Sequence, residues 1–480
     1  MIRFFYRQKK SFPLYFLCIL FFATGFTLFP VDKCFSISNS DYFYRTPNKI
    51  SDGWQTASIY EANIDAEKLF DLIHNIRDGS YKNIHSLLLV KDGKLILEEY
   101  FHGFHREKAH QIRSATKSIG SILVGIAIDH HFIKGTDEKI YPYFKDYEIG
   151  QKWNEKVKDV TLETLLTMTS GYACDDHEIP NFQCEKAMYK TNDWVEYALN
   201  LPMAHKPGEH WAYNSSSLIL VSEMISKTSK MTLPDFANRY LFQLLGINEF
   251  HWGFSPKGRA FIGGNSKMKP RDMAKIGFLM LNSGRWNGKQ IVSQKWINQS
   301  TRDHAKSKSY RGYGYLWWTG KQLFGEQIIT GYWAAGNGGN YIFVCPALSF
   351  VSVFTGGNYN SILEVQPLGM LINYVIPAML PPIPPRQITK LGSTILDSCV
   401  GEYQLQSGHI RVSVFKKGDD LYCKVLGKTS RMYPEKEDKF FVPDEVFGDW
   451  TFKLKRNEKG EVTSAIGYAA FQIMPFKKIK

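Results

Sequence analysis

Three serine–lysine pairs in this chain have the spacing Ser-x-x-Lys, which can support nucleophilic catalysis when both side chains lie on one helix face. The pairs begin at Ser114, Ser266 and Ser413. Ser413 lies in a predicted strand, where residues three apart face opposite ways, and Ser266 lies in a glycine-rich loop that a proline follows. Only Ser114 stands at the start of a strongly apolar segment with helical spacing, residues 119–133.

The position of Ser114 suits a reaction in which negative charge develops. A serine on the first turn of a helix lies where backbone N–H groups are free and the helix end carries partial positive charge. Lys117 lies one turn further along the same face, within reach of the hydroxyl. A lysine in a mostly apolar helix is costly unless it has a partner or a task. From these two residues alone, an alternative remains, in which Ser114 caps the helix and Lys117 is a surface residue.

The elements around this helix predict an α+β fold. Two β-rich runs, 84–90 and 95–101, are separated by an Asp-Gly turn and predict a hairpin. Between them and two late strands lies a region of helical patterns. This order predicts an antiparallel sheet closed by the two ends of the region, flanked by helices and with an inserted all-helical region. The late strands are 341–345 and 350–355, and the helical patterns are 162–168, 193–200, 217–227, 233–245 and 271–283.

A proline-rich run at 381–385 separates this region from a different C-terminal part. Such backbone is stiff and extended, which is typical of a linker. Beyond it, short alternating runs separated by turn residues predict a small all-β sandwich or barrel; they are 410–415, 421–425, 439–442, 451–454 and 462–466. We therefore expect four parts: a signal peptide or anchor at 1–38, the α+β domain at 39–380, a linker at 381–388 and the small β domain at 389–480.

The first residues have the order of an export signal. Four basic residues between Arg3 and Lys10 precede an apolar run from Phe12 to Pro30. The small-x-small sequence 36–38 offers a cleavage site after Ser38. The run is nearly long enough to span a bilayer, so an uncleaved membrane anchor is the alternative. Both interpretations predict that the body of the protein is exported, either periplasmic or anchored in the membrane and facing outside the cytoplasm.

Composition excludes several classes of protein. The hydrophobic share of 44% and the aromatic share of 15% are typical of a globular chain rather than a disordered or fibrous one. The formal net charge of +13 raises the question of a nucleic-acid partner. The basic residues are scattered, and no RNA-binding motif, basic helix or zinc finger accompanies them, which favours a solvated basic surface. Weak adhesion to an anionic membrane or cell-wall polymer stays open.

The cysteines and histidines give no metal-binding pattern. No pair has zinc spacing, and we expect neither a metal nor a cofactor. Cys174 and Cys184 are close enough in sequence to form a disulfide that closes a loop, if the compartment is oxidising. The other cysteines outside the N-terminal segment are expected to be buried small hydrophobes or to form one further bridge; they are Cys345, Cys399 and Cys423.

Five sequence blocks, in order, resemble the serine β-lactamase and penicillin-binding-protein superfamily, in its class C and esterase branch. The first is Ile112-Arg113-Ser114-Ala115-Thr116-Lys117-Ser118, which looks like the nucleophile motif. The others are a helix-to-loop signature at 165–172, a second catalytic motif at 207–215, a further block at 270–277 and a third motif at 336–340. The blocks cover roughly residues 80 to 375. The tail resembles the small β-barrel, or lipocalin-like, domain often appended to such hydrolases.

The resemblance implies catalytic roles. Ser114 attacks a carbonyl and forms an acyl-enzyme, while Lys117 and Tyr213 remove the hydroxyl proton and later serve proton transfer. The backbone N–H groups of Ser114 and Gly339 form the oxyanion hole. Ser215 would hydrogen-bond within the Lys117–Tyr213 network. Three further residues are implied in substrate binding: Tyr172, Asn337 and Gly338. The loop through Cys174 and Cys184 either covers the site or is an exposed loop.

Two departures from the family pattern bear on the substrate. The second motif reads Tyr213-Asn214-Ser215, where β-lactamases of this class carry Tyr-x-Asn, and the third begins with Gly336, where many relatives carry a lysine or histidine. Losing that cation removes a charge-assisted hydrogen bond to a substrate carboxylate, worth about 1.5–3 kcal/mol. The motifs are instead similar to the 6-aminohexanoate-dimer hydrolase type, which predicts a small ester or linear amide as substrate. The alternatives are a weak β-lactamase or D-Ala-D-Ala carboxypeptidase and a catalytically silent cell-wall-binding protein.

Overall fold

The computed structural model describes residues 42–147, 155–177, 184–307, 311–382, 386–406, 410–425, 427–444 and 449–480. The predicted export segment at 1–38, its Cys34, and part of the predicted linker, residues 383–385, lie outside the described residues. All that follows concerns the unit from Tyr42 to Lys480.

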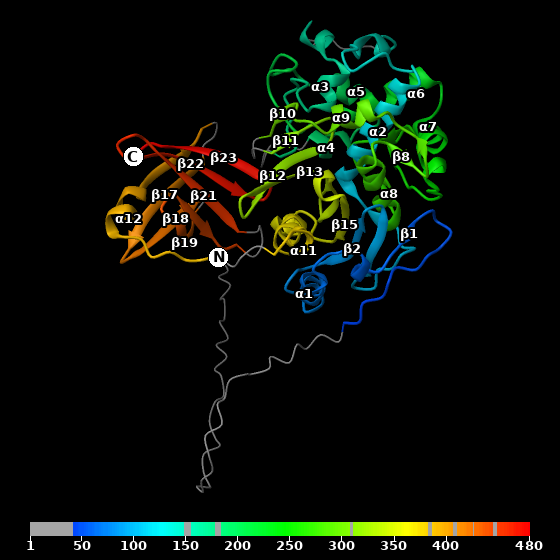
Figure 1. Ribbon diagram of the computed structural model, residues 1–480. Helices are drawn as coiled ribbons and strands as arrows, with labels where there is room; N and C mark the ends of the chain where they lie inside the picture. Colours follow the sequence, from blue (N-terminus) through cyan, green and yellow to red (C-terminus); the bar gives the residue numbers. More distant parts are fainter. Residues whose placement is uncertain are drawn as a thin grey trace, which may run out of the picture. The chain divides into compact units, whose positions relative to one another are not determined.

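The central element is a nine-stranded sheet with the strand order β1-β3-β2-β15-β14-β13-β12-β11-β10 (Figure 1). All its pairs are antiparallel except the short one between β1 and β3. Strand β15 pairs with β2, so the end of the domain closes the sheet against its beginning. The predicted fold class is therefore confirmed. The strands are β1 Gln55–Thr56, β2 Ile84–Lys91, β3 Lys94–Tyr100, β10 Ala305–Lys306, β11 Gly312–Tyr313, β12 Trp318–Phe324, β13 Gln327–Gly336, β14 Asn340–Cys345 and β15 Phe350–Gly356.

The β2–β3 hairpin forms where the Asp-Gly pair predicts it. Asp92 and Gly93 both have positive φ, 49° and 79°, which a two-residue turn with the right twist requires. One face of the sheet packs on α1 (Ala66–Arg77) and on the helical run that follows β15. That run, Ile362–Met379, is the one helical segment of the described chain that is long and apolar enough to cross a membrane, and 56% of it is buried. It comprises η8 Ile362–Val365, α10 Gln366–Met370, η9 Leu371–Val375 and α11 Ile376–Met379.

The other face of the sheet packs against the inserted helical region. Its first helix, α2 (Thr116–Asp129), is buried over nearly its whole length, because it is apolar on several faces. The predicted helix at 233–245 is instead a succession of α, π and 3-10 turns that Gly246 ends at a φ of 63°. The remaining helices are η1 Ile59–Glu61, η2 Arg113–Ala115, η3 Tyr141–Phe144, η4 Glu155–Asp159, α3 Leu162–Leu166, α4 Cys184–Met188, α5 Trp194–Leu199, α6 Leu218–Ser229, α7 Leu233–Ala237, η5 Asn238–Phe242, η6 Gln243–Leu245, α8 Pro270–Leu281, α9 Gln294–Ser300 and η7 Pro346–Leu348; the short strand pairs are β4 His110–Gln111 with β7 Lys267–Met268, β5 Gly253–Phe254 with β6 Ala260–Phe261, and β8 Arg285–Trp286 with β9 Lys289–Gln290.

The C-terminal part is a closed antiparallel barrel in which β16 pairs with β23. Its interior is filled by apolar side chains such as Phe440, Phe452 and Phe476. The five predicted strands are present, and the structure adds β16, β19 and β23. The elements are α12 Ser393–Cys399, β16 Gly401–Leu405, β17 Arg411–Lys417, β18 Asp420–Val425, β19 Lys428–Lys436, β20 Lys439–Val442, β21 Trp450–Arg456, β22 Val462–Ala469 and β23 Gln472–Lys478.

The turn between β22 and β23 packs into the core of the first domain. Phe471 is 1% exposed and contacts Trp333 and Phe343, with ring centroids 5.6 and 4.9 Å apart. Its backbone N–H donates to Gln322 Oε1 at 3.0 Å. Through Phe471, the barrel therefore shares part of one hydrophobic core with the sheet, in addition to its connection along the chain.

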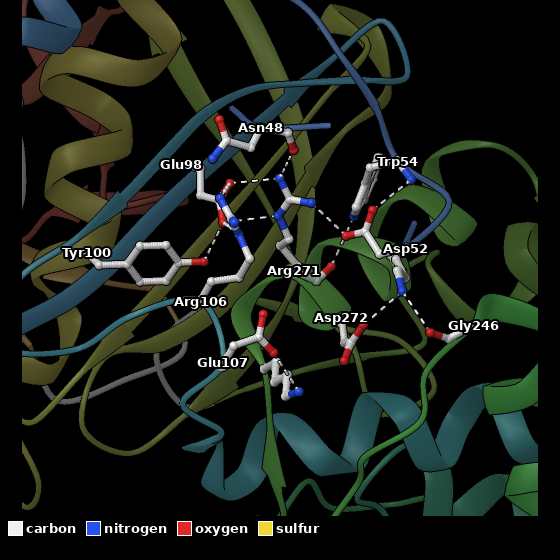
Figure 2. Close-up of polar contacts among 12 residues, drawn as sticks. Asn48, Asp52, Trp54, Glu98, Tyr100, Arg106, Glu107, Gly246, Arg271 and Asp272 are labelled. Atoms are coloured by element: carbon white, nitrogen blue, oxygen red, sulfur yellow. Dashed lines mark hydrogen bonds and ion pairs between the residues drawn. The ribbon is translucent and has the colours of Figure 1, made fainter. Parts of the chain in front are cut away.

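A buried ion cluster joins α8 to the N-terminal edge of the sheet (Figure 2). Arg271 donates two hydrogen bonds to Glu98 of β3, at 3.0 and 2.8 Å, and one to Asp52 at 2.7 Å. Arg106 donates two more to Glu98. Burial alone would raise the pKa of Glu98, but the hydrogen bonds from Arg106 and Arg271 bring it below its ordinary value. The sequence block 270–277 thus carries, in Arg271, a buried cation that ties α8 to β3 and to Asp52.

Candidate functional site

Ser114 lies in the single 3-10 turn η2, directly before α2. The backbone on either side of it is tightly fixed: Ile112 N–H donates to the Ser266 carbonyl at 2.9 Å. Arg113 has a φ of 50°, a left-handed conformation that is uncommon for a residue with a side chain and is often found at functional sites. The turn therefore presents Ser114 in one backbone geometry.

Lys117 is 1% exposed and lies one turn further on in α2. Its Nζ donates to Ser114 Oγ at 2.9 Å and to the Gly263 carbonyl. Among the described residues no carboxylate lies within ion-pair distance of this amine. Because Lys117 is buried, the alternative in which it is a surface residue is wrong. Burying an amine without a counter-ion costs stability.

Tyr213 comes to the same point from a segment 96 residues away. Its ring centroid is 4.9 Å from Lys117 Nζ, and only 6% of the residue is exposed. His177 stacks on the ring, with centroids 4.4 Å apart and planes 8° from parallel, and Trp318 lies 6.0 Å away. A hydroxyl, an amine and a phenol thus come from two distant segments to one location, as the proposed chemistry demands.

The glycines of the third motif lie at the β13–β14 turn beside the Ser114 turn. A Cβ on Gly336 would be 2.0 Å from the Ile112 carbonyl oxygen and 3.2 Å from Ala115 N. No side chain fits there, so this glycine has a steric reason apart from the loss of a cation. Gly338 and Gly339 have φ values of 97° and 93°. The strand end that carries Gly339 is therefore held against the nucleophile turn.

Three other predicted site residues are engaged differently from what we expected. Ser215 Oγ is buried without a hydrogen-bond partner among the described residues, so it does not take part in the expected Lys117–Tyr213 network; its backbone begins the turn into α6. Asn337 uses its side chain on Asn360, donating at 3.1 Å and accepting from the Asn360 N–H at 2.9 Å. Tyr172 is 2% exposed, and its buried hydroxyl has no hydrogen-bond partner among the described residues. Burial raises its pKa.

Gly338 also has a structural role. A Cβ on this residue would lie 2.6 Å from the ring of Tyr359, and Gly338 forms a β-bridge with Asn358. The close packing of that ring explains the glycine without a substrate contact. The resemblance implied substrate binding by Asn337 and Gly338, whereas in the structure both residues hold the β13–β14 turn to the chain after β15.

The sequence predicted a disulfide between Cys174 and Cys184 for an oxidising compartment and left open whether their loop covers the site. Cys174 and Cys184 form a disulfide with their Cα atoms 6.0 Å apart; the other cysteines in the described chain are free and buried. Asp176 lies close to both sulfurs, a grouping that could hold a metal ion only if the two thiols were free. With the disulfide formed, Cys174, which lies three positions before the His177 that stacks on Tyr213, is linked covalently to the start of α4. The nearby cysteines were a usable signal for this.

Glu185 follows this disulfide and is buried where the charge of Lys117 acts on it. Burial raises its pKa, and the charge of Lys117 acts in the opposite direction. Tyr189 donates its hydroxyl to Glu185 Oε1 at 2.5 Å. The site therefore holds one carboxyl group that no sequence motif indicated.

Comparison with known proteins agrees with this geometry. The beta-lactamase family model matches residues 85–361, more than half of the chain. Among solved structures, a Bacillus anthracis protein assigned as a 6-aminohexanoate-dimer hydrolase is 17% identical with a TM-score of 0.55; the match covers 68% of this chain and 87% of that one. The octameric penicillin-binding protein homologue from Pyrococcus abyssi is 18% identical with a TM-score of 0.50, over 86% and 99% of the two chains.

A family VIII carboxylesterase is 15% identical with a TM-score of 0.50, over 66% of this chain and 97% of that one. At such identities these likenesses show the fold alone. No curated protein matches by sequence. The family match, the sheet with its inserted helical region and the Ser-x-x-Lys helix at its centre lead to one conclusion: this chain belongs to the beta-lactamase family and is a serine hydrolase.

Proposed function

We propose that the protein is exported and cleaves carboxylic ester or linear amide bonds through an acyl-enzyme on Ser114. The observation that carries this proposal is the buried Lys117 amine, which forms no ion pair in the part of the chain that the structure describes and lies 2.9 Å from Ser114 Oγ and 4.9 Å from the centre of the Tyr213 ring. Such an amine has no evident structural task. Its neighbours are the two groups that a proton transfer from serine requires.

In the first half of the reaction, Ser114 Oγ attacks the carbonyl carbon while its proton passes to the Lys117–Tyr213 pair. The negative charge that develops on the carbonyl oxygen is stabilised by the backbone N–H groups of Ser114 and Gly339. The tetrahedral intermediate collapses, the bond to the alcohol or amine breaks, and the pair returns the proton to that leaving group. Water then attacks the acyl-enzyme along the reverse route and releases the carboxylic acid.

The substrate class rests on the motifs. The third motif begins at Gly336, where the nucleophile turn leaves no room for the cation that many relatives use to hold a β-lactam carboxylate. This disfavours β-lactam and D-Ala-D-Ala substrates and favours neutral esters and linear amides. The names of two solved neighbours, a carboxylesterase and a 6-aminohexanoate-dimer hydrolase, support a hydrolase of this kind and do not identify its substrate.

Export rests on two observations. The basic and then apolar order of residues 1–38 is typical of a signal, and a disulfide at Cys174–Cys184 is typical of an oxidising compartment. We expect the N-terminal sequence of the mature protein to start at Asn39, or the full chain to sit in the membrane facing outward. A full-length chain recovered from the cytoplasm would contradict export without touching the chemistry.

The chemistry is tested by comparing Ser114→Ala with Ser413→Ala, whose serine belongs to another Ser-x-x-Lys sequence in the barrel strand β17. With p-nitrophenyl esters and linear amides, Ser114→Ala should lose turnover and labelling by a fluorophosphonate, while Ser413→Ala keeps both. Full turnover by Ser114→Ala would end the proposal. If kcat/KM is higher for nitrocefin or D-Ala-D-Ala peptides than for esters, the β-lactamase or carboxypeptidase alternative is favoured. If the fluorophosphonate labels the protein under no condition, the catalytically silent wall-binding alternative is favoured.

A further inference from the structure

The segment that carries Tyr213 has little regular structure of its own. Residues 211–217 lie in neither a helix nor a strand. Its backbone is held from one side by Met168, whose carbonyl accepts from Ala212 N–H at 2.9 Å. From the other side it is held by Asp176. The position of the phenol therefore depends on a small number of individual contacts.

Asp176 makes contacts on both sides of the catalytic tyrosine. Its backbone N–H donates to the Tyr213 carbonyl at 2.7 Å, and its Oδ2 accepts from the Ser215 N–H at 2.8 Å. The second carboxylate oxygen, Oδ1, accepts from the Glu185 N–H at 3.1 Å. One side chain thus joins the second catalytic motif to the start of α4.

Covalent and aromatic contacts fix the backbone of Asp176 itself. The Cys174–Cys184 disulfide ties the residue two positions before it to the residue directly before Glu185. On its other side His177 stacks on the Tyr213 ring, and the His177 N–H donates to Asp175 Oδ1 at 3.0 Å. Residues 174–177 therefore lie along the Tyr213 segment and are fixed at both ends.

We propose that Asp176 is a positioning residue for the reaction, which holds the Tyr213 phenol in register with Lys117 and Ser114, and that the Cys174–Cys184 disulfide holds Asp176 in place. This inference rests on the proposed role of Tyr213. Displacement of a catalytic group by about 1 Å can cost on the order of 100-fold in rate, because the reacting atoms no longer meet in the productive geometry. Asp176 acts through the backbone of its neighbours and need not touch the substrate.

A matched control separates positioning from stability. The Asp193 carboxylate also accepts two backbone N–H groups, from Val195 and Glu196 at 3.0 and 3.3 Å, at the start of α5. We compare Asp176→Ala, Asp176→Asn and Asp193→Ala by thermal unfolding and by ester hydrolysis, well below the lowest midpoint. Asp193→Ala should lower the midpoint and keep kcat. Asp176→Ala should lower kcat by about 10- to 100-fold with KM little changed, and Asp176→Asn, which keeps one acceptor oxygen, should lie between it and the wild type.

The outcomes are distinguishable from failure of the proposed function. If Ser114→Ala is inactive while Asp176→Ala keeps the wild-type kcat, only the positioning role is wrong. If both Asp176→Ala and Asp193→Ala lower the unfolding midpoint and kcat by similar amounts, Asp176 has only a structural role and the proposal is overturned. If Ser114→Ala stays active, the proposed function itself fails.

The disulfide half has its own experiment. A water-soluble phosphine cleaves the S–S bond, giving two thiols, and takes an oxygen atom from water to become the phosphine oxide; alkylation and mass measurement then count the reduced protein. We expect reduction to lower kcat about 3- to 10-fold, a smaller effect than that of Asp176→Ala because the hydrogen bonds remain. The double variant Cys174→Ser/Cys184→Ser should match the reduced protein and not respond to phosphine. Fully reduced protein with unchanged kcat would overturn this half and leave the Asp176 result standing.

Discussion

Two buried cations in this molecule, Lys117 and Arg271, have opposite surroundings. Arg271 is 3% exposed and is surrounded by acceptors: the Glu98 carboxylate, Asp52 and a backbone carbonyl (Figure 2). Lys117 is 1% exposed, and in the described structure its hydrogen-bond partners are a hydroxyl and a carbonyl. Both cations lie on helices that pack against the same sheet. Their difference is in charge compensation, not in depth.

The comparison separates a structural ion cluster from a reactive group. A buried cation with two carboxylates and a full set of acceptors recovers much of its desolvation cost and fixes the elements it joins. A buried amine with no anion recovers little, and it persists only where another demand holds it. The demand here is the proposed proton transfer from Ser114. The sharpest tests therefore remove each cation and measure activity and stability separately.

The largest effect is expected from Lys117→Met, which keeps the volume and removes the amine. We expect kcat/KM for an ester to fall by at least about 10⁴-fold, close to 5.5 kcal/mol, because the Lys117–Tyr213 pair that takes the proton of Ser114 loses its amine. The free energy of unfolding should be unchanged or higher, since no counter-ion is left behind. Esterase assays and urea unfolding measure the two quantities. The control is Lys275→Met, which removes an equally buried lysine paired with Asp272 at 2.9 Å and should lower stability instead.

Arg271→Met should give the opposite result. Removing this guanidinium leaves Asp52 without its ion pair and Glu98 with Arg106 as its remaining cation, and breaking such a cluster costs about 3–5 kcal/mol of unfolding free energy. The kcat per folded molecule should stay close to that of the wild type, because in the described structure no hydrogen bond or ion pair of Arg271 reaches Ser114, Lys117 or Tyr213. Urea unfolding and an active-site titration test this. If the variant has the stability of the wild type but a lower kcat, the ion cluster also determines the geometry of the site. The contrast between Arg271 as a structural group and Lys117 as a reactive group would then be wrong.

How much of this could be read from the sequence depends on the range of the contact. Ser114 and Lys117 were predictable because they are three residues apart on a helix whose apolar pattern is strong. The β2–β3 hairpin was predictable because its turn residues act locally. The Gly263 carbonyl that accepts from Lys117, 146 positions away, has no side chain to mark it. Asp176 meets Ser215 across 39 positions, and no spacing rule connects a loop aspartate to a backbone N–H.

The barrel shows the same limit in another form. Strand β19, Lys428–Lys436, was missed because its residues are mostly polar and include Pro434, so its alternation is weak. In a closed barrel such a strand is stabilised by hydrogen bonds to the strands on both of its edges, here β18 and β20, rather than by its own alternation. From the sequence, Gly336 was interpreted as the replacement of a substrate-binding cation. Only the fold shows the Ile112 carbonyl, which leaves no room for a side chain at this position.

Gly336→Ala tests whether the reactive centre depends on backbone packing as strictly as on its amine. The added Cβ would overlap the Ile112 carbonyl, which is backbone and cannot rotate away. We expect a loss of about 1–3 kcal/mol in stability from overpacking and a fall in kcat of roughly 10- to 100-fold, because the Ser114 turn must shift. Gly392→Ala adds a methyl group where no atom lies within 4 Å and should change neither. Unchanged kcat in Gly336→Ala would mean that the turn tolerates displacement.

A pair of buried histidines gives a third case to set beside Lys117 and Arg271. His85 Nδ1 and His110 Nε2 lie 2.8 Å apart beneath the third motif. Burial, and for His85 the charge of His110, lowers the pKa of each to about 4 from an ordinary value of 6.5. Between these values the unfolded chain binds protons that the folded one does not. Stability should therefore fall as pH decreases from 6.5 to 4, by at most about 1.4 kcal/mol per pH unit for each histidine and less for the half-exposed His85.

The ion cluster loses its contribution in a different window. Because the pKa of Glu98 is lowered, its stabilising effect is complete above the ordinary carboxyl range and is lost as pH falls through the folded value, below the histidine window. Urea unfolding at half-unit steps from pH 7.5 to 3.5 resolves the two. His110→Gln should flatten the upper part of the curve, and Glu98→Gln only the lower part, whereas the exposed His74→Gln should change neither. If the slope of stability against pH is unaltered in His110→Gln, this imidazole binds as many protons in the folded protein as in the unfolded chain. It would then not be neutral in the folded protein, contrary to our expectation.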